Sequence, residues 1–332
     1  MFRASVATTL ILAVLAIAAP SRAATTITFD PSGSTFTAPS SIDANGVVVG
    51  DWSADNAIGH GFVRAADGTI TTFDPHGSDV TEPRGIDADG RIIGDYVPHN
   101  RSRYHGFVRD ANGAITTFDA PHTKVTRVLG FDPQGGITGY FHGRHGDPTG
   151  FVRTPEGTIL TFKVARAIFT LGYGINGSGV VAGIYVSKGR PKIGSFVRAP
   201  DGTITKFGAP GHGEVDATAI NSGGVVTGTY YHGNAAQGFL RDAAGNFTIF
   251  DPQGSVDTEP RAINASGAVV GTYETADKVQ HAFLRQSDGS IGNIDPPDAV
   301  SGATPTSIND NGAVAGWYRG SDGLTHGFIR MP

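Results

Sequence analysis

The sequence predicts an all-β protein: a seven-bladed β-propeller with four antiparallel strands per blade and a ring closed by the N-terminal strand. Three observations carry this prediction. A unit of 43 to 45 residues occurs seven times, a period typical of propellers and solenoids. Each unit consists of β-type segments separated by Gly turns, and no segment shows helical periodicity. The first copy begins with a segment that belongs at the end of a unit, so the first strand can complete the last blade.

Two residues recur in every unit and fix the alignment. One is the Gly of the second strand: Gly50, Gly94, Gly139, Gly183, Gly228, Gly271 and Gly316. The other is the Arg that closes the third strand: Arg64, Arg109, Arg153, Arg198, Arg241, Arg285 and Arg330. No unit is missing and no linker intervenes, so residues 24–332 are predicted to form a single domain. A β-solenoid is the alternative, but it would need atypical capping repeats.

The four strands of a unit, A to D from the axis outward, follow in order. Strand A is short and ends on Asx, as at Ile42-Asp43, and an Asx-x-x-Gly turn such as Asp87–Gly90 follows. That turn suits a hairpin with a left-handed Gly. Strand B is β-branched and closes on an aromatic residue such as Tyr96. Strand C carries Gly/Ala-Phe-Val/Leu-Arg, and strand D is of the type Ile204–Phe207.

The pattern at Ala262–Tyr273 and His281–Leu284 resembles the extracellular HAF-type repeat family of bacteria. The resemblance covers residues 24–332 and implies a secreted, propeller-like protein. Several copies depart from the His-Ala-Phe core, at Thr149, at Gly194-Ser195 and at Gln237. The shared residues are turn and core residues, so the resemblance transfers no functional residue.

The first 23 residues have the pattern of a secretory signal peptide. Arg3 precedes an apolar run, and Ser21-Arg22-Ala23 fits a cleavage site. A membrane anchor is the alternative, but the run is short for a span and is interrupted by Thr8 and Thr9. We therefore expect a secreted protein, extracellular or periplasmic, with no membrane span after cleavage and a monomeric state.

Composition excludes several classes of protein. Lys and Arg number 25 against 30 Asp and Glu, a net charge of −5, which argues against nucleic acid as a partner. The absence of Cys excludes disulfides, a thiol nucleophile and thiolate metal sites. No cofactor is expected, and a divalent metal is possible because the loops are rich in His.

Residues that recur in every unit are expected to be structural. The strand-C Arg could donate hydrogen bonds to the Asx that ends strand A. The His that opens strand C in four units could bond a neighbouring turn: His60, His105, His281 and His326. The Asp-x-Asp-Gly turns resemble fragments of calcium loops but lack the downstream bidentate Glu.

Functional residues are expected where the repeats differ. All 11 His fall in D–A or B–C connections or at the start of strand C, which share one face of a propeller, and we expect this loop face to bind ligands. The entry to strand A carries the most varied charges. Its acid–base candidates are Glu82, Asp216 and Glu259. Its ligand-binding candidates, with the nearby loops, are Arg84, Arg127, Tyr173, His212, Arg261, His76 and His122.

Three functions remain open from the sequence. The first is binding of a polar small ligand, a glycan or an extracellular protein on the loop face, with exposed aromatic residues such as Tyr104, Phe141 and Tyr231 contributing. The second is a polysaccharide lyase or hydrolase with carboxylates of shifted pKa at the mouth of the central channel. The third is a purely structural surface component.

Overall fold

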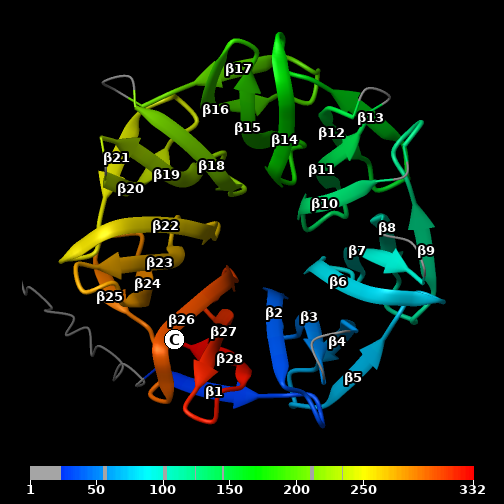
Figure 1. The fold of residues 1–332 in the computed structure, drawn as a ribbon, viewed down its shortest axis with the longest axis vertical. Helices are drawn as coiled ribbons and strands as arrows, with labels where there is room; N and C mark the ends of the chain where they lie inside the picture. Colours follow the sequence, from blue (N-terminus) through cyan, green and yellow to red (C-terminus); the bar gives the residue numbers. More distant parts are fainter. Residues whose placement is uncertain are drawn as a thin grey trace, which may run out of the picture.

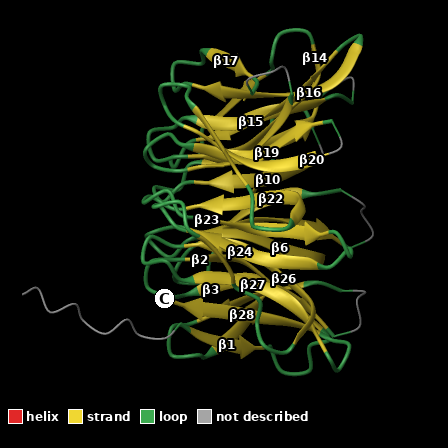
Figure 2. Ribbon diagram, turned by 90° about the vertical axis from the view of Figure 1, so that its left-hand side faces the viewer, coloured by secondary structure: helices red, strands yellow, loops and turns green. Residues whose placement is uncertain are grey.

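The computed structural model describes residues 24–54, 58–99, 103–123, 125–143, 146–209, 213–233 and 235–332. These residues contain 28 strands and no helix, which confirms the predicted all-β class. The predicted signal peptide lies outside the described residues. The strands are arranged around a common axis (Figure 1), and in the side view they run across the thickness of the disc (Figure 2).

The 28 strands fit seven blades of four, which we number in chain order. Blade 1 holds β2 (Phe36–Ile42), β3 (Val48–Ser53), β4 (His60–Arg64) and β5 (Ile70–Phe73). Blade 2 holds β6 (Ser78–Ile86), β7 (Ile92–Pro98), β8 (His105–Arg109) and β9 (Ile115–Phe118). Blade 3 holds β10 (Thr126–Phe131), β11 (Ile137–His142), β12 (Pro148–Arg153) and β13 (Ile159–Phe162). Blade 4 holds β14 (Ala167–Ile175), β15 (Val181–Ser187), β16 (Arg190–Arg198) and β17 (Ile204–Phe207).

The remaining three blades follow the same order. Blade 5 holds β18 (Glu214–Ile220), β19 (Val226–His232), β20 (Ala235–Arg241) and β21 (Phe247–Phe250). Blade 6 holds β22 (Ser255–Ile263), β23 (Val269–Thr275), β24 (Gln280–Arg285) and β25 (Ile291–Asn293). Blade 7 holds β26 (Ala299–Ile308), β27 (Val314–Gly320), β28 (Thr325–Met331) and the N-terminal strand β1 (Thr25–Phe29).

Consecutive strands within a blade pair antiparallel, and the first strand of each blade lies nearest the axis (Figure 1). The hairpin between the first two strands closes on a Gly with positive φ, such as Gly46 at 82° or Gly90 at 77°. The Asx that begins this turn caps it: the Asp43 carboxylate accepts hydrogen bonds from the amides of Asn45 and Val47. The Asx side chain at this position, Asp in three units and Asn in four, therefore serves the fold, as its recurrence in every unit indicated.

The core repeats with the blades. One Phe of each third strand is fully buried: Phe62, Phe107, Phe151, Phe196, Phe239, Phe283 and Phe328. In six blades the Arg two residues later lies over a Phe at the outer edge of the preceding blade, as Arg109 does over Phe73 at 4.9 Å. The other pairs are Arg64–Phe29, Arg153–Phe118, Arg198–Phe162, Arg241–Phe207 and Arg285–Phe250. The predicted Arg–Asx hydrogen bonds are wrong, because the guanidinium crosses to the neighbouring blade and stacks on an aromatic ring.

This stacking predicts a small, measurable contribution to stability. Replacement of Arg109 by Met is expected to lower the free energy of unfolding by about 1 kcal/mol, since a partly buried cation–π contact is lost while apolar bulk is kept. Arg330 lies over no ring in the described part of the chain, so Arg330→Met is the matched control and should cost less. Equal losses in denaturant unfolding of the two variants would contradict a stabilising role for the ring.

The four strand-C His residues are structural, as expected. Nδ1 of His60 lies 2.6 Å from Oδ2 of Asp74, and Nδ1 of His281 lies 2.8 Å from Oδ2 of Asp295. The same pair forms between His105 and Asp119 and between His326 and Asp30. Each Asp follows the outermost strand of the blade, so the pair joins the third strand to the connection that leaves the blade.

Candidate functional site

The three predicted acid–base candidates and Arg127, a predicted ligand-binding residue, occupy one register position in four innermost strands. Glu82 lies in β6, Arg127 in β10, Asp216 in β18 and Glu259 in β22. The sequence analysis placed them at the loop entry of strand A, and this is a correction: Glu82 pairs in register with Asp95 of β7, well inside the strand. They therefore belong to the interior of the innermost strands β6, β10, β18 and β22, which surround the axis of the ring (Figure 1).

Five charged side chains on the first and second strands of blades 1 to 3 form an ion cluster. They are Asp51, Glu82, Arg84, Asp95 and Arg127. The Asp95 side chain is fully buried, with its carboxylate 3.2 Å from Nε of Arg84 and 2.7 Å from Nε of Arg127. Glu82 forms an ion pair with Arg84 and lies 2.9 Å from Nη2 of Arg127. The cluster thus joins blade 2 to blade 3 through charge-assisted contacts.

Charge within the ion cluster is not balanced. Three carboxyls face two guanidinium groups, so full ionisation leaves one negative charge in excess. Burial, followed by the nearby Glu82 carboxylate, raises the pKa of Asp51 to about 7. Burial also raises the pKa of Asp95 to about 7, although Arg84 and Arg127 act in the opposite direction. The cluster therefore contains carboxyls that can hold a proton near neutral pH.

Asp51 and Asp95 were not among the residues predicted from the sequence, although a signal was present. Both follow the recurring Gly of the second strand, as Gly50-Asp51 and Gly94-Asp95. The other five units carry an uncharged residue there: Tyr140, Ile184, Thr229, Thr272 and Trp317. A carboxylate occurs at this position in only two copies, in blades 1 and 2. These copies are near the first strands that carry Glu82, Arg84 and Arg127, so the sequence indicated this side of the ring.

Acidic side chains gather on the opposite side of the axis, in blades 5 and 6. Asp257 and Glu259 line a cavity of about 70 Å³ together with Tyr273. Burial and the carboxylates of Asp216, Glu259 and Asp257 raise the pKa of Tyr231 to about 12. Glu259 also forms an exposed ion pair of 3.2 Å with Arg261, the predicted ligand-binding residue of this blade.

The other predicted site residues are not brought into the ion cluster. Tyr173 lies in β14, where burial and then the Asp216 carboxylate raise its pKa. His122 has a left-handed backbone at φ 59° and lines a cavity of about 370 Å³ with Phe141 in blade 3. His76 belongs to the connection between β5 and β6, and His212 lies outside the described residues. Among the described residues, no group of three or more His, Asp or Glu is arranged to hold a metal ion.

The expected aromatic binding surface is corrected by the structure. Phe141 is 7 % exposed and packs in the core of blade 3. Tyr104 is covered by the Arg127 guanidinium, 3.6 Å from its ring centroid. Only Tyr231, at 38 % exposed, is an open aromatic surface among the three. A flat aromatic loop face is therefore not what this chain presents.

Comparisons with known proteins establish the fold alone. No family model matches the chain, and no curated protein matches it. The structure is similar to virginiamycin B lyase from Staphylococcus aureus, with a TM-score of 0.61, 15% identity and coverage of 93% of this chain and 100% of that one. It is also similar to the β-propeller domain of the Trilobed protease from Pyrococcus furiosus, with a TM-score of 0.62, 14% identity and coverage of 89% and 95%.

A third neighbour is TolB from Acinetobacter baumannii, with a TM-score of 0.52, 15% identity and coverage of 74% of this chain and 62% of that one. These neighbours confirm the predicted β-propeller architecture. Within the part of the chain that the structure describes, no helix is long and apolar enough to cross a membrane.

Proposed function

We propose that this protein is a secreted propeller that binds a polar ligand at its axis, through the ion cluster of blades 1 to 3. One observation carries the proposal. The Asp51 carboxyl is partly buried beside Glu82 and Asp95, and it makes no side-chain hydrogen bond to another residue in the described part of the chain. Polar groups taken out of water are almost always hydrogen-bonded. A carboxyl that has a shifted pKa and no hydrogen-bond partner, and that lies beside partly exposed charged groups, is typical of a ligand site.

The chemistry of the ion cluster favours a ligand rich in hydroxyl groups, a glycan or another small polar compound. The Glu82 and Arg84 side chains are 23% and 30% exposed, so they offer an acceptor and a donor towards the axis. A protonated Asp51 would add a second donor. Carboxylates and guanidinium groups on rigid strands can hold several hydroxyl groups in a fixed geometry.

A closed ring of seven blades is part of this proposal. Pairing of β1 with β28, from Thr25 opposite Met331 to Phe29 opposite Gly327, supports closure by the N-terminal strand. The neighbour from Pyrococcus furiosus is described as having an open velcro topology, so closure is a property to be tested in this chain. A secreted location likewise rests on the predicted signal peptide of residues 1–23.

The second candidate function is acid–base catalysis, as in a lyase or hydrolase acting on a polysaccharide. Asp51 and Asp95, each with a pKa of about 7, favour it, because a general acid or base works best near its own pKa. One fold neighbour is itself a lyase, and a catalytically inactive variant of that lyase is described with Quinupristin. The ion cluster contains no imidazole, so catalysis here would have to use carboxyls.

Thermal unfolding of the purified protein against a panel of oligosaccharides and divalent metals tests the proposal. We expect at least one oligosaccharide to raise the midpoint of the wild type, by linkage. Glu82→Gln should abolish the shift, because it replaces a charged carboxylate oxygen of the ion cluster, which pairs with Arg84 and Arg127, by an amide that donates. Glu259→Gln, at the same register position across the axis, is the matched control and should retain it.

Three other outcomes of this experiment would favour a different site or a different function. A shift lost only in Glu259→Gln would move the site to blades 5 and 6 and overturn this assignment. A bound oligosaccharide that is also cleaved would establish the catalytic alternative. No shift with any compound would reject a small-ligand site at the axis and favour a structural role or a protein partner.

A further inference from the structure

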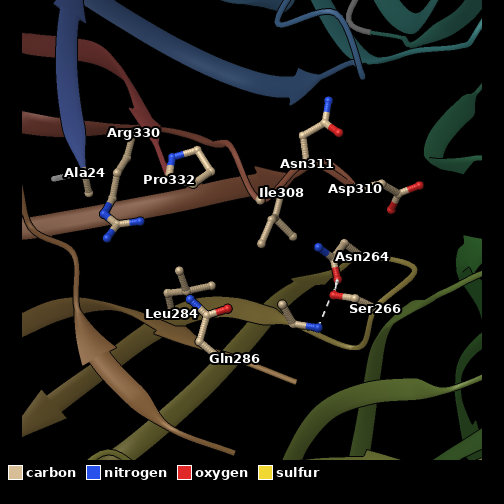
Figure 3. Close-up of a pocket in the computed structure, with 12 residues that line it drawn as sticks. Ala24, Asn264, Ser266, Leu284, Gln286, Ile308, Asp310, Asn311, Arg330 and Pro332 are labelled. Carbon is tan, nitrogen blue, oxygen red and sulfur yellow. Dashed lines mark hydrogen bonds between the residues drawn. The ribbon is translucent and has the colours of Figure 1, made fainter. Parts of the chain in front are cut away.

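A cavity of about 500 Å³ opens between blades 6 and 7, on the side of the disc opposite the predicted loop face. In Figure 3 the Arg330 guanidinium enters it from the side of Ala24. Ile308 and Pro332 border it from above and Leu284 and Gln286 from below. Its volume is in the range of small-molecule sites. Its walls combine apolar side chains with polar ones, among which Arg330 is the one cation and Asp310 the one carboxylate side chain.

Blade 6 departs from the repeat in the core cluster that includes Leu284 and Ile308 of this cavity. In blades 1 and 2 the outermost strand ends in a Phe whose ring packs against a Gly of the third strand. A Cβ added to Gly61 would lie 2.8 Å from the Phe73 ring. Blade 6 has Ala282 in the position of this Gly and Ile294 in the position of the Phe, paired by a hydrogen bond from the Ile294 amide to the Ala282 carbonyl. Blade 6 therefore has no aromatic ring at this position.

The Arg330 side chain is therefore left without the partner that its six equivalents possess. It has no hydrogen bond, ion pair or ring contact in the described part of the chain. Burial lowers the pKa of Arg330, and no neighbouring carboxyl raises it, in contrast to Arg285, which has Asp288 nearby. The Asp310 carboxylate of the cavity accepts a hydrogen bond from the Ala265 amide at 2.8 Å.

We propose that this cavity binds a small organic anion, with a carboxylate on Arg330 and an aromatic or branched apolar body against Leu284 and Ile308. A guanidinium binds a carboxylate through two parallel hydrogen bonds. An aromatic ring on the ligand would also give the Arg330 guanidinium the stacking partner that Phe provides in the other six blades and Ile294 does not. The site is separate from the ion cluster at the axis and does not depend on the function proposed for it.

Calorimetric titration with 3-phenylpropionate tests the site, with 3-phenylpropanol as the uncharged analogue and propionate as the anion without a ring. We expect 3-phenylpropionate to bind at least ten-fold more tightly than either analogue. Arg330→Met should weaken its binding at least ten-fold. Arg285→Met, the equivalent change one blade earlier, is the matched control and should leave it unchanged.

A second variant keeps the cation and gives it a ring partner within the protein. Ala282→Gly with Ile294→Phe restores the repeat and should place a ring over Arg330, as in the other six blades. This double variant should lose binding of 3-phenylpropionate and keep the wild-type fold by circular dichroism. Binding that survives both this variant and Arg330→Met, or no binding of 3-phenylpropionate to the wild type, would overturn the proposal.

Discussion

Deletion of residues 24–30 is expected to lower the thermal unfolding midpoint by about 10 °C or more. The deletion removes β1, which pairs over five residues with β28. It also removes Phe29, which is 8 % exposed and packs edge-on against Phe62 of blade 1 at 5.9 Å. The Arg64 guanidinium, 5.1 Å from the Phe29 ring, loses its partner as well. One short strand thus joins the last blade to the first, and its loss leaves β28 as an open edge prone to aggregation.

The same strand added as a separate peptide should restore stability. A peptide of residues 24–31 is expected to raise the midpoint of the deletion variant in a concentration-dependent way, because strand addition uses the free edge of β28. The same peptide with Phe29→Ala is the control and should rescue less, since a buried Phe contributes about 3 kcal/mol or more. If the deletion variant unfolds at the wild-type temperature, β1 does not close the ring.

The architecture was predictable because the same residue types form the turns and the core in every blade. The turn Gly, the buried Phe and the Asx cap recur at fixed spacing, so a single alignment predicts strands, turns and core. The partner of the strand-C Arg was not predictable in this way. Its ring, as with Arg109 and Phe73, belongs to the preceding blade, and only the packing of blade on blade brings the two together.

The candidate site was predicted in part. Comparison of the repeats identified Glu82, Arg84 and Arg127, because charges there break the symmetry of strand A. It did not identify Asp95, which belongs to the next strand and is buried beneath them. Phe141 was taken as an exposed aromatic, yet it packs in the core of blade 3. Which face of a strand is buried near its end depends on the neighbouring blade and is not encoded in one repeat.

Replacement of Asp51 by Asn is expected to stabilise the protein at pH 8 by about 2 to 4 kcal/mol. The pKa of this carboxyl is raised from 3.8 to about 7 in the folded protein. Between these two values the folded state binds more protons than the unfolded state, so the wild type loses stability as the pH rises from about 4 to 7. Asn has nearly the shape of a protonated Asp and carries no charge, so the variant should not show this loss.

Denaturant unfolding of both proteins at pH 4.5 and pH 8 measures the effect. The difference between them should be small at pH 4.5 and reach its full size at pH 8. Asp67→Asn is a control of opposite sign, because hydrogen bonds from Thr69 lower the pKa of that exposed carboxyl. It should lower stability slightly at pH 8. An Asp51→Asn variant that is less stable than the wild type at pH 8 would contradict the burial of an unpaired carboxylate.

The same variant connects stability to function. Carboxyls with strongly shifted pKa values cluster at active and binding sites. Asp51→Asn should therefore gain stability and, at the same time, reduce the midpoint shift caused by an oligosaccharide bound at the axis. If the variant gains stability and the shift is unchanged, Asp51 does not contact the ligand, and the site would be confined to Glu82, Arg84 and Arg127.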